Sequence, residues 1–310
     1  MNAEKRKAWN RALMRKAVSK ITRKPYTTSV YDGKKILDID EANDVIAAAI
    51  DRGTPFMAGR FGSSELNAFW RVKDEGHGFD TDPSAALKEA VFHTGLFPEK
   101  EEILERFARE MHHATSLVDL MAVWFQPMED YECRKWAKDP TYCYVRAIEP
   151  FFAEKPWTEK LAGKRVLVIH PFARTIVSQY ERREKLFANP GVLPSFTLLM
   201  QPAVQTIAGN RDERFADWFE AYDYMFEEAM RQEFDVAVLG CGAYGFPLAA
   251  RLKEAGKIAI HMGGTTQNLF GIRGRRWEER ENYRSLMNEY WVHASEVPEG
   301  ADWIEGGCYW

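Results

Sequence analysis

The sequence predicts an α/β fold, a mostly parallel Rossmann-like sheet with helices on both faces. Two observations carry this prediction. Short, continuously apolar runs of the kind found in strands buried on both faces recur through the chain, most clearly after residue 160. Helical patterns separate these runs, as in folds built from repeated strand–helix units. With 310 residues, 45% of them hydrophobic and 28% charged, the chain has the composition of an ordinary globular protein.

The first 25 residues differ sharply in charge from the remainder. They contain nine Lys and Arg against Glu4 alone, a net charge of +8, whereas the whole chain carries −4 and the remainder therefore −12. Apolar residues recur at every fourth position: Trp9, Leu13, Ala17 and Ile21. This spacing predicts an amphipathic helix over residues 3–22. Two interpretations stay open, contact of residues 1–24 with an anionic membrane and docking on the acidic body.

Charge and composition also exclude some classes of protein. The acidic body argues against nucleic-acid binding, which needs basic charge spread over one face. No apolar run approaches the roughly 18 residues that a membrane span requires. The four cysteines show no metal-binding spacing, which favours reduced thiols and therefore a cytoplasmic protein. If residues 1–24 bind lipid, we expect the protein to be peripheral to the inner face of the membrane. We expect an arm over residues 1–28 and one α/β domain over 29–310, with parts 29–160 and 161–310.

In the N-terminal part, an apolar segment at 36–38 leads to a helix at 41–52, which Asp40 caps and Gly53 closes. A short apolar strand then precedes a glycine-containing turn and a second helix. The remaining predicted segments are a strand at 55–58, a turn at 59–62, a helix at 63–72, a loop at 74–84, and helices at 84–93 and 99–112.

The C-terminal part contains the clearer strand signals. The predicted strands cover residues 165–169, 196–200, 234–239 and 257–261. The predicted helices between them cover residues 173–187, 212–232 and 246–255. Ligands of parallel α/β sheets bind outside the carboxyl ends of the strands, so candidate site residues are sought there.

The first strand end carries Arg60, Gly62, Ser63, Ser64 and Glu65. A glycine turn followed by a helix N-terminus offers free N–H groups to an anion, and an arginine adds a bidentate phosphate donor. The carboxylate of Glu65, in the first helical turn, could hold a divalent metal or accept a proton from an attacking hydroxyl. The alternative interpretation is that Glu65 only complements the helix dipole.

The next two strand ends carry a histidine, His170, and a glycine-rich turn. The His170 side chain either faces a ligand or is buried in the core with its hydrogen bonds made inside the protein. The turn contains Gly240, Gly242, Ala243, Tyr244 and Gly245 and matches G-x-G-x-x-G, the dinucleotide fingerprint, which also resembles the first motif of S-adenosylmethionine-dependent methyltransferases. Both families need an acidic residue at the end of the following strand. That position holds His261 and Met262, with no carboxylate.

The fourth strand end combines small polar residues with arginines. Its candidate binding residues are His261, Gly263, Gly264, Thr265, Gln267, Arg273 and Arg276. Glycines and an aromatic residue interleaved with arginines favour a loop that meets a polyanion, and the alternative is a solvated basic loop.

The segment from Arg60 to Glu65 resembles the R-x-G-x-x-E signature of GT-D-type glycosyltransferases, and residues 235–264 resemble the late Gly-rich unit that completes the donor site in that family. The resemblance implies a nucleotide-sugar donor and a parallel α/β sheet. The family pattern has Asp-x-Glu, whose carboxylates bind a divalent metal, Mn or Mg. Ser63 replaces that Asp here and His261 stands where an Asp is common, so Glu65 is the one candidate metal ligand that carries over.

The resemblance implies a hexosyl- or pentosyltransferase of polysaccharide biosynthesis, which would move a sugar to a glycan, lipid-linked or protein-linked acceptor. The expected catalytic residues are Glu65, Arg60 and His170, and the remaining candidates at the four strand ends would bind the nucleotide sugar. Two alternatives remain. One is a Rossmann-type S-adenosylmethionine-dependent methyltransferase or NAD-dependent enzyme, and the other is a non-enzymatic membrane-peripheral scaffold.

Overall fold

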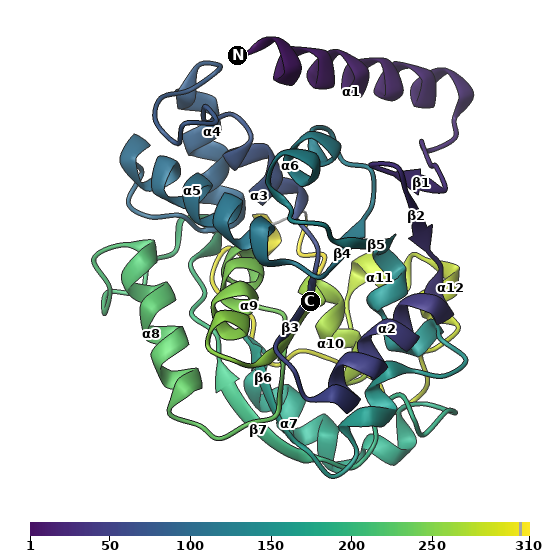
Figure 1. Ribbon diagram of the computed structural model, residues 1–310. Coiled ribbons are helices and arrows are strands. Elements are labelled where there is room, and N and C mark those ends of the chain that lie inside the picture. The colour runs from purple at the N-terminus through teal and green to yellow at the C-terminus, as the bar shows by residue number, and fades with distance from the viewer. Residues whose placement is uncertain (304–305) are drawn as a thin grey trace.

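The computed structural model describes residues 1–303 and 306–310. Its centre is a nine-stranded sheet with the order β1-β2-β5-β4-β3-β9-β8-β6-β7 (Figure 1). Every pairing in it is parallel except that of β1 with β2 at one edge. The predicted fold class, a mostly parallel α/β sheet, is confirmed.

The strands are short, and the four in the middle of the sheet order are buried along their whole length. They are β1 (Val30–Tyr31), β2 (Lys34–Leu37), β3 (Phe56–Gly59), β4 (Leu120–Val123), β5 (Thr141–Tyr144), β6 (Arg165–His170), β7 (Thr197–Pro202), β8 (Val236–Leu239) and β9 (Ile258–His261). A separate parallel pair is formed by β10 (Ile272–Arg273) and β11 (Val292–His293).

The helices connect these strands and cover the sheet. They are α1 (Ala3–Thr22), α2 (Ile39–Arg52), α3 (Ser63–Phe69), α4 (Pro83–Glu89), α5 (Glu101–Leu117), α6 (Glu129–Trp136), α7 (Ala173–Glu181), α8 (Trp218–Met230), α9 (Gly245–Glu254), α10 (Thr266–Leu269), α11 (Arg275–Glu278) and α12 (Glu281–Arg284).

Several strands and element ends differ from the sequence predictions. The strands β4 and β5, which lie between the edge and the middle of the sheet, were not predicted, nor were the two-residue strands β1, β10 and β11. Asp38, rather than Asp40, caps α2 through a capping box with Glu41. The helix predicted over 63–72 begins at Ser63 as expected, with Gly62 at the N-cap of α3, but it ends at Phe69. The helix predicted over 212–232 begins only after Asp217, whose carboxylate accepts from the N–H groups of Phe219 and Glu220.

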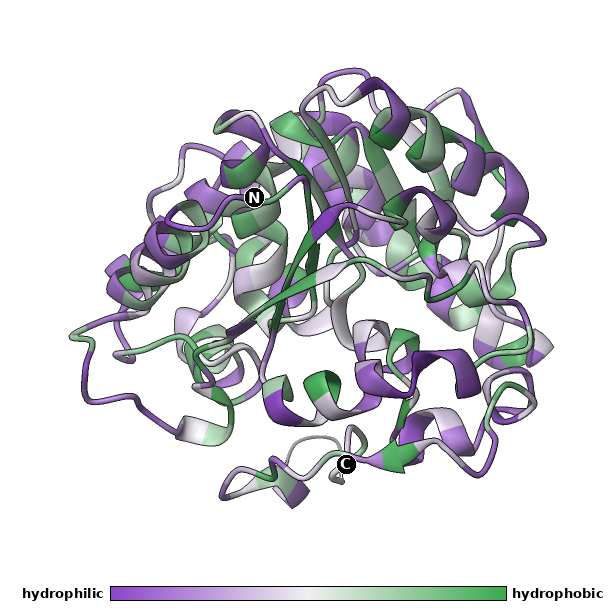
Figure 2. Cartoon of the chain, turned by 90° about the horizontal axis from the view of Figure 1, so that it is seen from below, coloured by the Kyte–Doolittle hydropathy of each residue, from purple (hydrophilic) through white to green (hydrophobic). Residues whose placement is uncertain are grey.

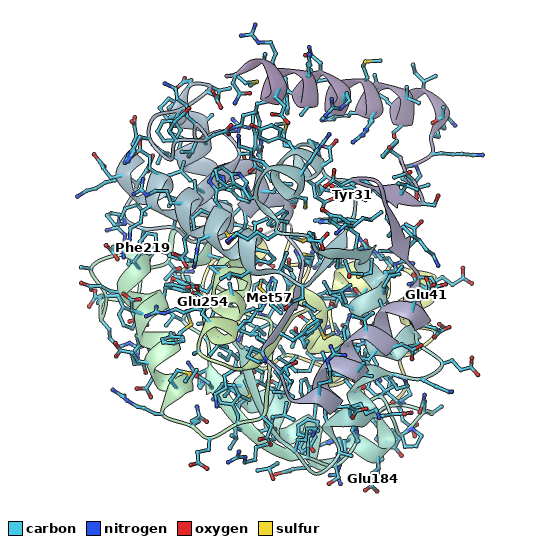
Figure 3. All side chains as sticks on the ribbon, in the orientation of Figure 1. Tyr31, Glu41, Met57, Glu184, Phe219 and Glu254 are labelled. Carbon is cyan, nitrogen blue, oxygen red and sulfur yellow. The ribbon has the colours of Figure 1, made fainter. Side chains whose placement is uncertain are left out.

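Each face of the sheet packs against its own set of helices. In β3, Met57 contributes to the core shared with α3, α5, α8 and α9, whereas Phe56 and Ala58 contribute to the core shared with α2 and α7. This alternation is the period of two expected of a strand. Figure 2 shows hydrophobic strands inside and more polar helix surfaces outside. In Figure 3, Met57 lies in the interior and Glu184 at the periphery.

The order of the strands creates a crevice at the carboxyl edge of the sheet. From β6 the chain moves outward to β7, whereas from β8 it moves to β9 on the opposite side. Because β6 and β8 are neighbours, their carboxyl ends form a topological switch point, where ligands of open α/β sheets bind. The end of β6 carries His170, and the glycine-rich turn follows β8.

The basic N-terminal helix α1 lies along the outside of the domain (Figure 1). One face is docked, with Ala8 and Ala12 buried and Trp9 stacked on Trp70 at 4.8 Å between ring centroids. Leu13 and Ile21, which continue the four-residue spacing of Trp9, are exposed. The helix is therefore docked, but only part of its predicted apolar stripe faces the body. No helix within the described part of the chain is long and apolar enough to cross a membrane.

Candidate functional site

A cavity of about 350 Å³ lies at the carboxyl edge of the sheet. Segments following β3, β4, β5, β6, β7, β8 and β9 all contribute to its walls. Its volume falls within the range of small-molecule sites. Sixteen of the seventeen residues proposed from the sequence line it, from all four predicted strand ends: Arg60, Gly62, Ser63, Ser64, Glu65, His170, Gly240, Gly242, Ala243, Tyr244, His261, Gly263, Gly264, Thr265, Gln267 and Arg276.

Glu65 folds back from the first turn of α3 over the backbone of Gly62. A Cβ atom at position 62 would overlap the Glu65 carboxylate, so this conformation requires glycine there. Burial raises the pKa of Glu65, and the nearby Arg60 guanidinium opposes that shift. A carboxylate with a raised pKa is a better proton acceptor near neutral pH than an ordinary surface glutamate.

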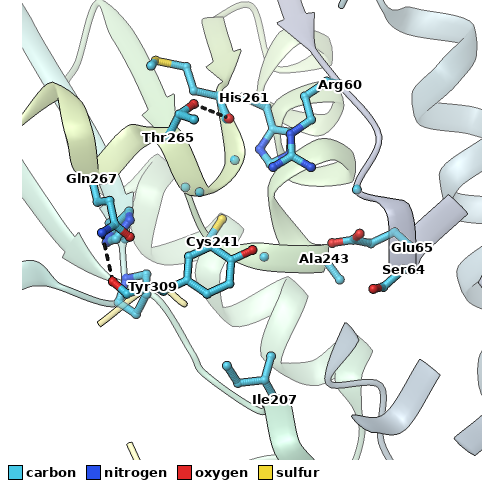
Figure 4. A pocket seen from close by; sticks show the side chains of 18 of the residues that line it. Arg60, Ser64, Glu65, Ile207, Cys241, Ala243, His261, Thr265, Gln267 and Tyr309 are labelled. Carbon is cyan, nitrogen blue, oxygen red and sulfur yellow. Dashed lines mark hydrogen bonds between the residues drawn. The ribbon is translucent and has the colours of Figure 1, made fainter. Parts of the chain in front are cut away.

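Arg60 is positioned by the neighbouring carbonyl of Phe61. Its Nη1 donates to that oxygen at 3.2 Å, and Trp124 Nε1 donates to the same oxygen at 3.1 Å. The guanidinium also lies 5.9 Å from the centre of the Trp124 ring. On its other side, a Cβ at Gly263 would overlap the guanidinium, so the small residue after β9 makes room for Arg60. Figure 4 shows Arg60 beside His261, with Glu65 on the same wall.

The two buried histidines at strand ends are neutral. Burial lowers the pKa of His170 and of His261 to about 3. His170 Nδ1 accepts the N–H of Phe172 at 3.0 Å, which leaves Nε2 as the protonated ring nitrogen. His261 Nδ1 is buried and has no hydrogen-bond partner among the described residues. A neutral imidazole can orient a ligand by hydrogen bonding, but it supplies no positive charge at neutral pH.

Packing against these histidines explains two glycines of the G-x-G-x-x-G match. A Cβ at Gly240 would meet the His170 ring and Thr266, and a Cβ at Gly245 would meet the His261 ring. Gly242 instead has a left-handed φ of +58° and open space around its Cα, which lets the backbone approach a ligand closely. The motif thus accommodates two histidine side chains. The next strand, β9, lies beside β8 and ends in His261, at the position where a dinucleotide site needs a carboxylate.

The charged residues of the cavity are mainly cationic. Among the described lining residues there are four arginines and two glutamates: Arg60, Arg146, Arg276, Arg280, Glu65 and Glu149. Arg276 Nη1 donates to the Tyr309 hydroxyl at 3.0 Å. With both buried histidines neutral, the arginines give the cavity an excess of positive charge. A cluster of guanidinium groups suits a phosphate-bearing ligand.

Arg273, in contrast, lies outside the cavity. Its Nη2 donates to the carbonyl of Trp291 at 2.7 Å, and its Nη1 is 3.9 Å from the Glu278 carboxylate. The side chain therefore ties the β10 segment to the chain near β11. The sequence analysis expected Arg273 at the polyanion site, but the structure places it away from the cavity walls, with its guanidinium engaged in these two contacts.

Glu149 is a buried carboxyl group of the site that the sequence analysis missed. It follows β5 and the short helix Val145–Ile148, and its Oε2 accepts the Tyr283 hydroxyl at 2.7 Å. Burial raises the pKa of Glu149 to about 7, against the lowering effects of Tyr283, Arg146 and Arg60. The run of aromatic and β-branched residues at 141–145 was the signal for a strand whose end would carry this site.

Aromatic residues near the C-terminus form another wall that no motif indicated. The Tyr309 ring packs against Gly264, and its carbonyl accepts from Gln267 Nε2 at 3.0 Å (Figure 4). Trp310 also lines the cavity, and its Nε1 donates to the carbonyl of Glu296 at 2.9 Å. The sequence gives no local signal for this placement, since it depends on a long-range return of the chain.

The described carboxylates do not form a metal site by themselves. No group of three His, Cys, Asp or Glu side chains within residues 1–303 and 306–310 is arranged to hold a metal ion. At the start of α3, Ser63 stands two residues before Glu65, and the Glu65 carboxylate lies in the field of Arg60. This donor set does not fit the two-carboxylate metal site of the family pattern, so no chemical step is assigned to a metal.

Comparison with known proteins gives structural similarities only. No protein-family model and no curated protein matches the chain. Its structure is similar to a chain described as the selenomethionine-substituted domain of unknown function 1792, with 14% identity, 87% coverage of this chain, 94% of the other and a TM-score of 0.45. A second structure of that domain, described as having a distinct glycosyltransferase fold, shows 16% identity, 74% and 78% coverage and a TM-score of 0.42.

A third similar structure is described as a new glycosyltransferase from Streptococcus sanguinis, again with domain 1792. It shows 12% identity, 86% coverage of this chain, 97% of the other and a TM-score of 0.37. The resemblance seen in the sequence and these structural similarities concern the same kind of protein. At 12–16% identity the similarity concerns the fold alone.

Proposed function

We propose that the protein is a glycosyltransferase that transfers a sugar from a nucleotide-sugar donor to a glycan, lipid-linked or protein-linked acceptor. The observation that carries this proposal is the cationic cavity at the switch point of the sheet. It combines four arginines with a half-buried carboxylate of raised pKa, Glu65, in one cavity. The arginines suit a diphosphate, and the carboxylate suits removal of a proton from a hydroxyl group.

In the proposed reaction the acceptor hydroxyl attacks the anomeric carbon of the donor sugar. Its proton passes to the Glu65 carboxylate as the new carbon–oxygen bond forms. The bond from the anomeric carbon to the diphosphate oxygen breaks, and its electron pair leaves with the nucleoside diphosphate. Arg60 and Arg276 offset the charge that develops on this leaving group, the kind of electrostatic contribution that dominates many enzymes.

The glycine-lined backbone and the aromatic walls complete the proposed donor site. The turn at Gly242 would approach the phosphates or ribose, and Tyr309, Trp310 and Trp124 would contact the nucleoside or the sugar. Aromatic faces bind both bases and sugar rings through apolar contact. The neutral Nε2–H of His170 and the unpartnered Nδ1 of His261 are proposed to orient donor hydroxyl or phosphate oxygens.

The runner-up is a methyltransferase or NAD-dependent enzyme built on the glycine-rich turn. Two observations disfavour it. The end of β9 carries His261 instead of the carboxylate that would hold ribose hydroxyls. Four arginines would also repel the sulfonium charge of S-adenosylmethionine.

A thermal-shift panel tests the proposal against the runner-up. Nucleoside diphosphates, nucleotide sugars, S-adenosylmethionine and NAD are each added at saturating concentration, with and without manganese. A ligand that binds the folded state raises the melting temperature by mass action. We expect at least one nucleoside diphosphate or nucleotide sugar to stabilise the protein without manganese. Stabilisation by S-adenosylmethionine or NAD alone would overturn the glycosyltransferase proposal, and stabilisation only with manganese would overturn the metal-independent arrangement.

A further inference from the structure

The contacts on the docked face of α1 determine which of its side chains face solvent. Lys5 is buried, and its Nζ donates to the carbonyl of Val72 at 2.7 Å and lies 2.9 Å from the Asp80 carboxylate. Further along, Arg15 contacts the Asp130 carboxylate at 3.1 Å. Together with the stacking of Trp9 on Trp70, these contacts hold α1 in one rotational setting over most of its length.

The opposite face of α1 exposes large apolar side chains. The exposed fractions are 46% for Leu13, 68% for Met14, 56% for Val18 and 82% for Ile21. Met14 and Ile21 lie seven residues apart, about two helical turns, and therefore point in nearly the same direction. Besides these four, the described chain has six other exposed large hydrophobic residues: Tyr26, Val30, Val177, Met230, Val297 and Trp303.

Exposed cations surround this apolar face. Seven Lys and Arg residues in and just after α1 are exposed: Arg6, Lys7, Arg11, Lys16, Lys20, Arg23 and Lys24. The single acidic residue of α1 is Glu4. Apolar side chains bordered by cations on one helix face are the pattern of a helix that lies in the interface of an anionic bilayer.

We propose that the outward face of α1 binds the surface of an anionic phospholipid bilayer. The charge of α1 favours the bilayer as the partner of this face. Pairing α1 with α1 of a second copy of the chain would bring two strongly cationic helices together, which is unfavourable. An anionic bilayer attracts the arm and repels the body, whose net charge is −12, so it would orient the protein with α1 toward the membrane. Leu13, Met14, Val18 and Ile21 would enter the boundary between headgroups and acyl chains.

The docking of α1 places this contact close to the cavity. Trp9 stacks on Trp70, the C-cap residue of α3, and the first turn of α3 carries Glu65. A helix of seven residues is about 10 Å long, so one short helix separates the anchor of α1 from the cavity wall. The arm would thus hold the cavity near the membrane surface. The membrane proposal stands on α1 itself and does not depend on the proposed transfer reaction.

Vesicle co-sedimentation of the full-length chain tests this inference. Vesicles of phosphatidylglycerol mixed with phosphatidylcholine are compared with phosphatidylcholine alone, at low and at high salt. We expect binding to the anionic vesicles only, weakened by salt because the attraction is a screened surface field. Met14→Glu/Ile21→Glu should weaken binding by roughly tenfold or more, since two inserted apolar side chains are lost. Lys20→Glu should weaken it by about fivefold or more, the factor expected per cation removed.

Val297→Glu is the matched control. The exposed fraction of Val297, 60%, is similar to that of Val18, but Val297 lies outside α1. It should bind vesicles like the unmodified chain, and the melting temperatures of all variants should agree with that of the unmodified chain. The inference is overturned if the chain fails to bind anionic vesicles, if it binds neutral vesicles equally well, or if the α1 variants bind as the control does. Self-association in solution that the α1 variants abolish would identify a second copy as the occupant and would also overturn it.

Discussion

Arg273, at the end of β10, and Arg276, in α11, show how two arginines three residues apart acquire different environments. Arg276 lines the cavity, whereas Arg273 donates to the Trp291 carbonyl away from it. We predict that Arg276→Ala weakens nucleoside diphosphate binding by roughly 10- to 100-fold, the range for a lost hydrogen bond to a charged group. Arg273→Ala should leave that affinity within about twofold and instead lower the melting temperature. Isothermal titration of both variants checks this, and equal losses of affinity would contradict the assignment.

At the residue scale, the sequence predicted the cavity lining well because each candidate followed a strand signal. Arg60, Glu65 and His170 were located by counting from the ends of apolar runs. The environment of each residue could not be predicted in the same way. His170 is neutral because it is buried, and Arg273 is turned away from the cavity because it donates to the carbonyl of Trp291, a residue distant in sequence.

Individual elements depend on single buried groups, and the turn after β4 is the clearest example. Glu129 is buried, and its carboxyl oxygens accept the backbone N–H groups of Trp124 and Phe125. Burial raises the pKa of Glu129 to about 8, and the hydrogen bonds from these N–H groups oppose that shift. The folded protein therefore keeps this group protonated at a pH at which the unfolded chain has released the proton.

This difference predicts a pH dependence of stability. With a folded pKa of about 8 and a usual value of 4.5, the stabilising contribution of Glu129 is complete below about pH 4.5 and is lost as the pH rises through 8. Glu129→Gln, which cannot ionise, should flatten the fall in melting temperature over that window, while the exposed Glu184→Gln should not. A melting profile of Glu129→Gln as steep as that of the unmodified chain would show that Glu129 does not titrate there.

The docking of α1 gives a second prediction at the element scale. Trp9 stacks on the buried Trp70, whereas Ile21 is exposed on the same helix. Trp9→Ala should lower the free energy of unfolding by about 1–3 kcal/mol, through lost burial and stacking. Ile21→Ala should change it by no more than about 0.5 kcal/mol. Urea unfolding of both variants measures this, and a larger effect for Ile21 would mean that α1 docks through its other face.

Elements were predictable where periodicity and caps agreed, as for α2 and the strands after residue 160. The strands β4 and β5 were missed because the apolar run of each adjoins a helix or an aromatic segment that obscures it. The orientation of α1 was also beyond prediction. Trp9, Leu13 and Ile21 share a spacing, but only contact with Trp70 determines which of them is buried.

At the scale of the whole molecule, the sheet order brings residues from both halves of the chain to one cavity. Strand β3 from the first half pairs with β9 from the second, so Arg60 and Glu65 face His261 and the segment that follows it. Alternating strands and helices predicted a parallel sheet, but no local pattern specifies which strands are neighbours. Glu149, Tyr283 and Tyr309 enter the site only through that long-range arrangement.

The central claim is that this cavity transfers a sugar with Glu65 as the proton acceptor. The most direct test is release of nucleoside diphosphate from a panel of nucleotide sugars, with water as the attacking hydroxyl, by the unmodified chain and by Glu65→Gln, with donor affinity measured for both. We predict release from at least one donor, and a loss of roughly 100- to 10,000-fold in Glu65→Gln, the range for removal of a general base, with donor affinity retained. Donor release by Glu65→Gln at the rate of the unmodified chain, or no release from any donor, would contradict the claim.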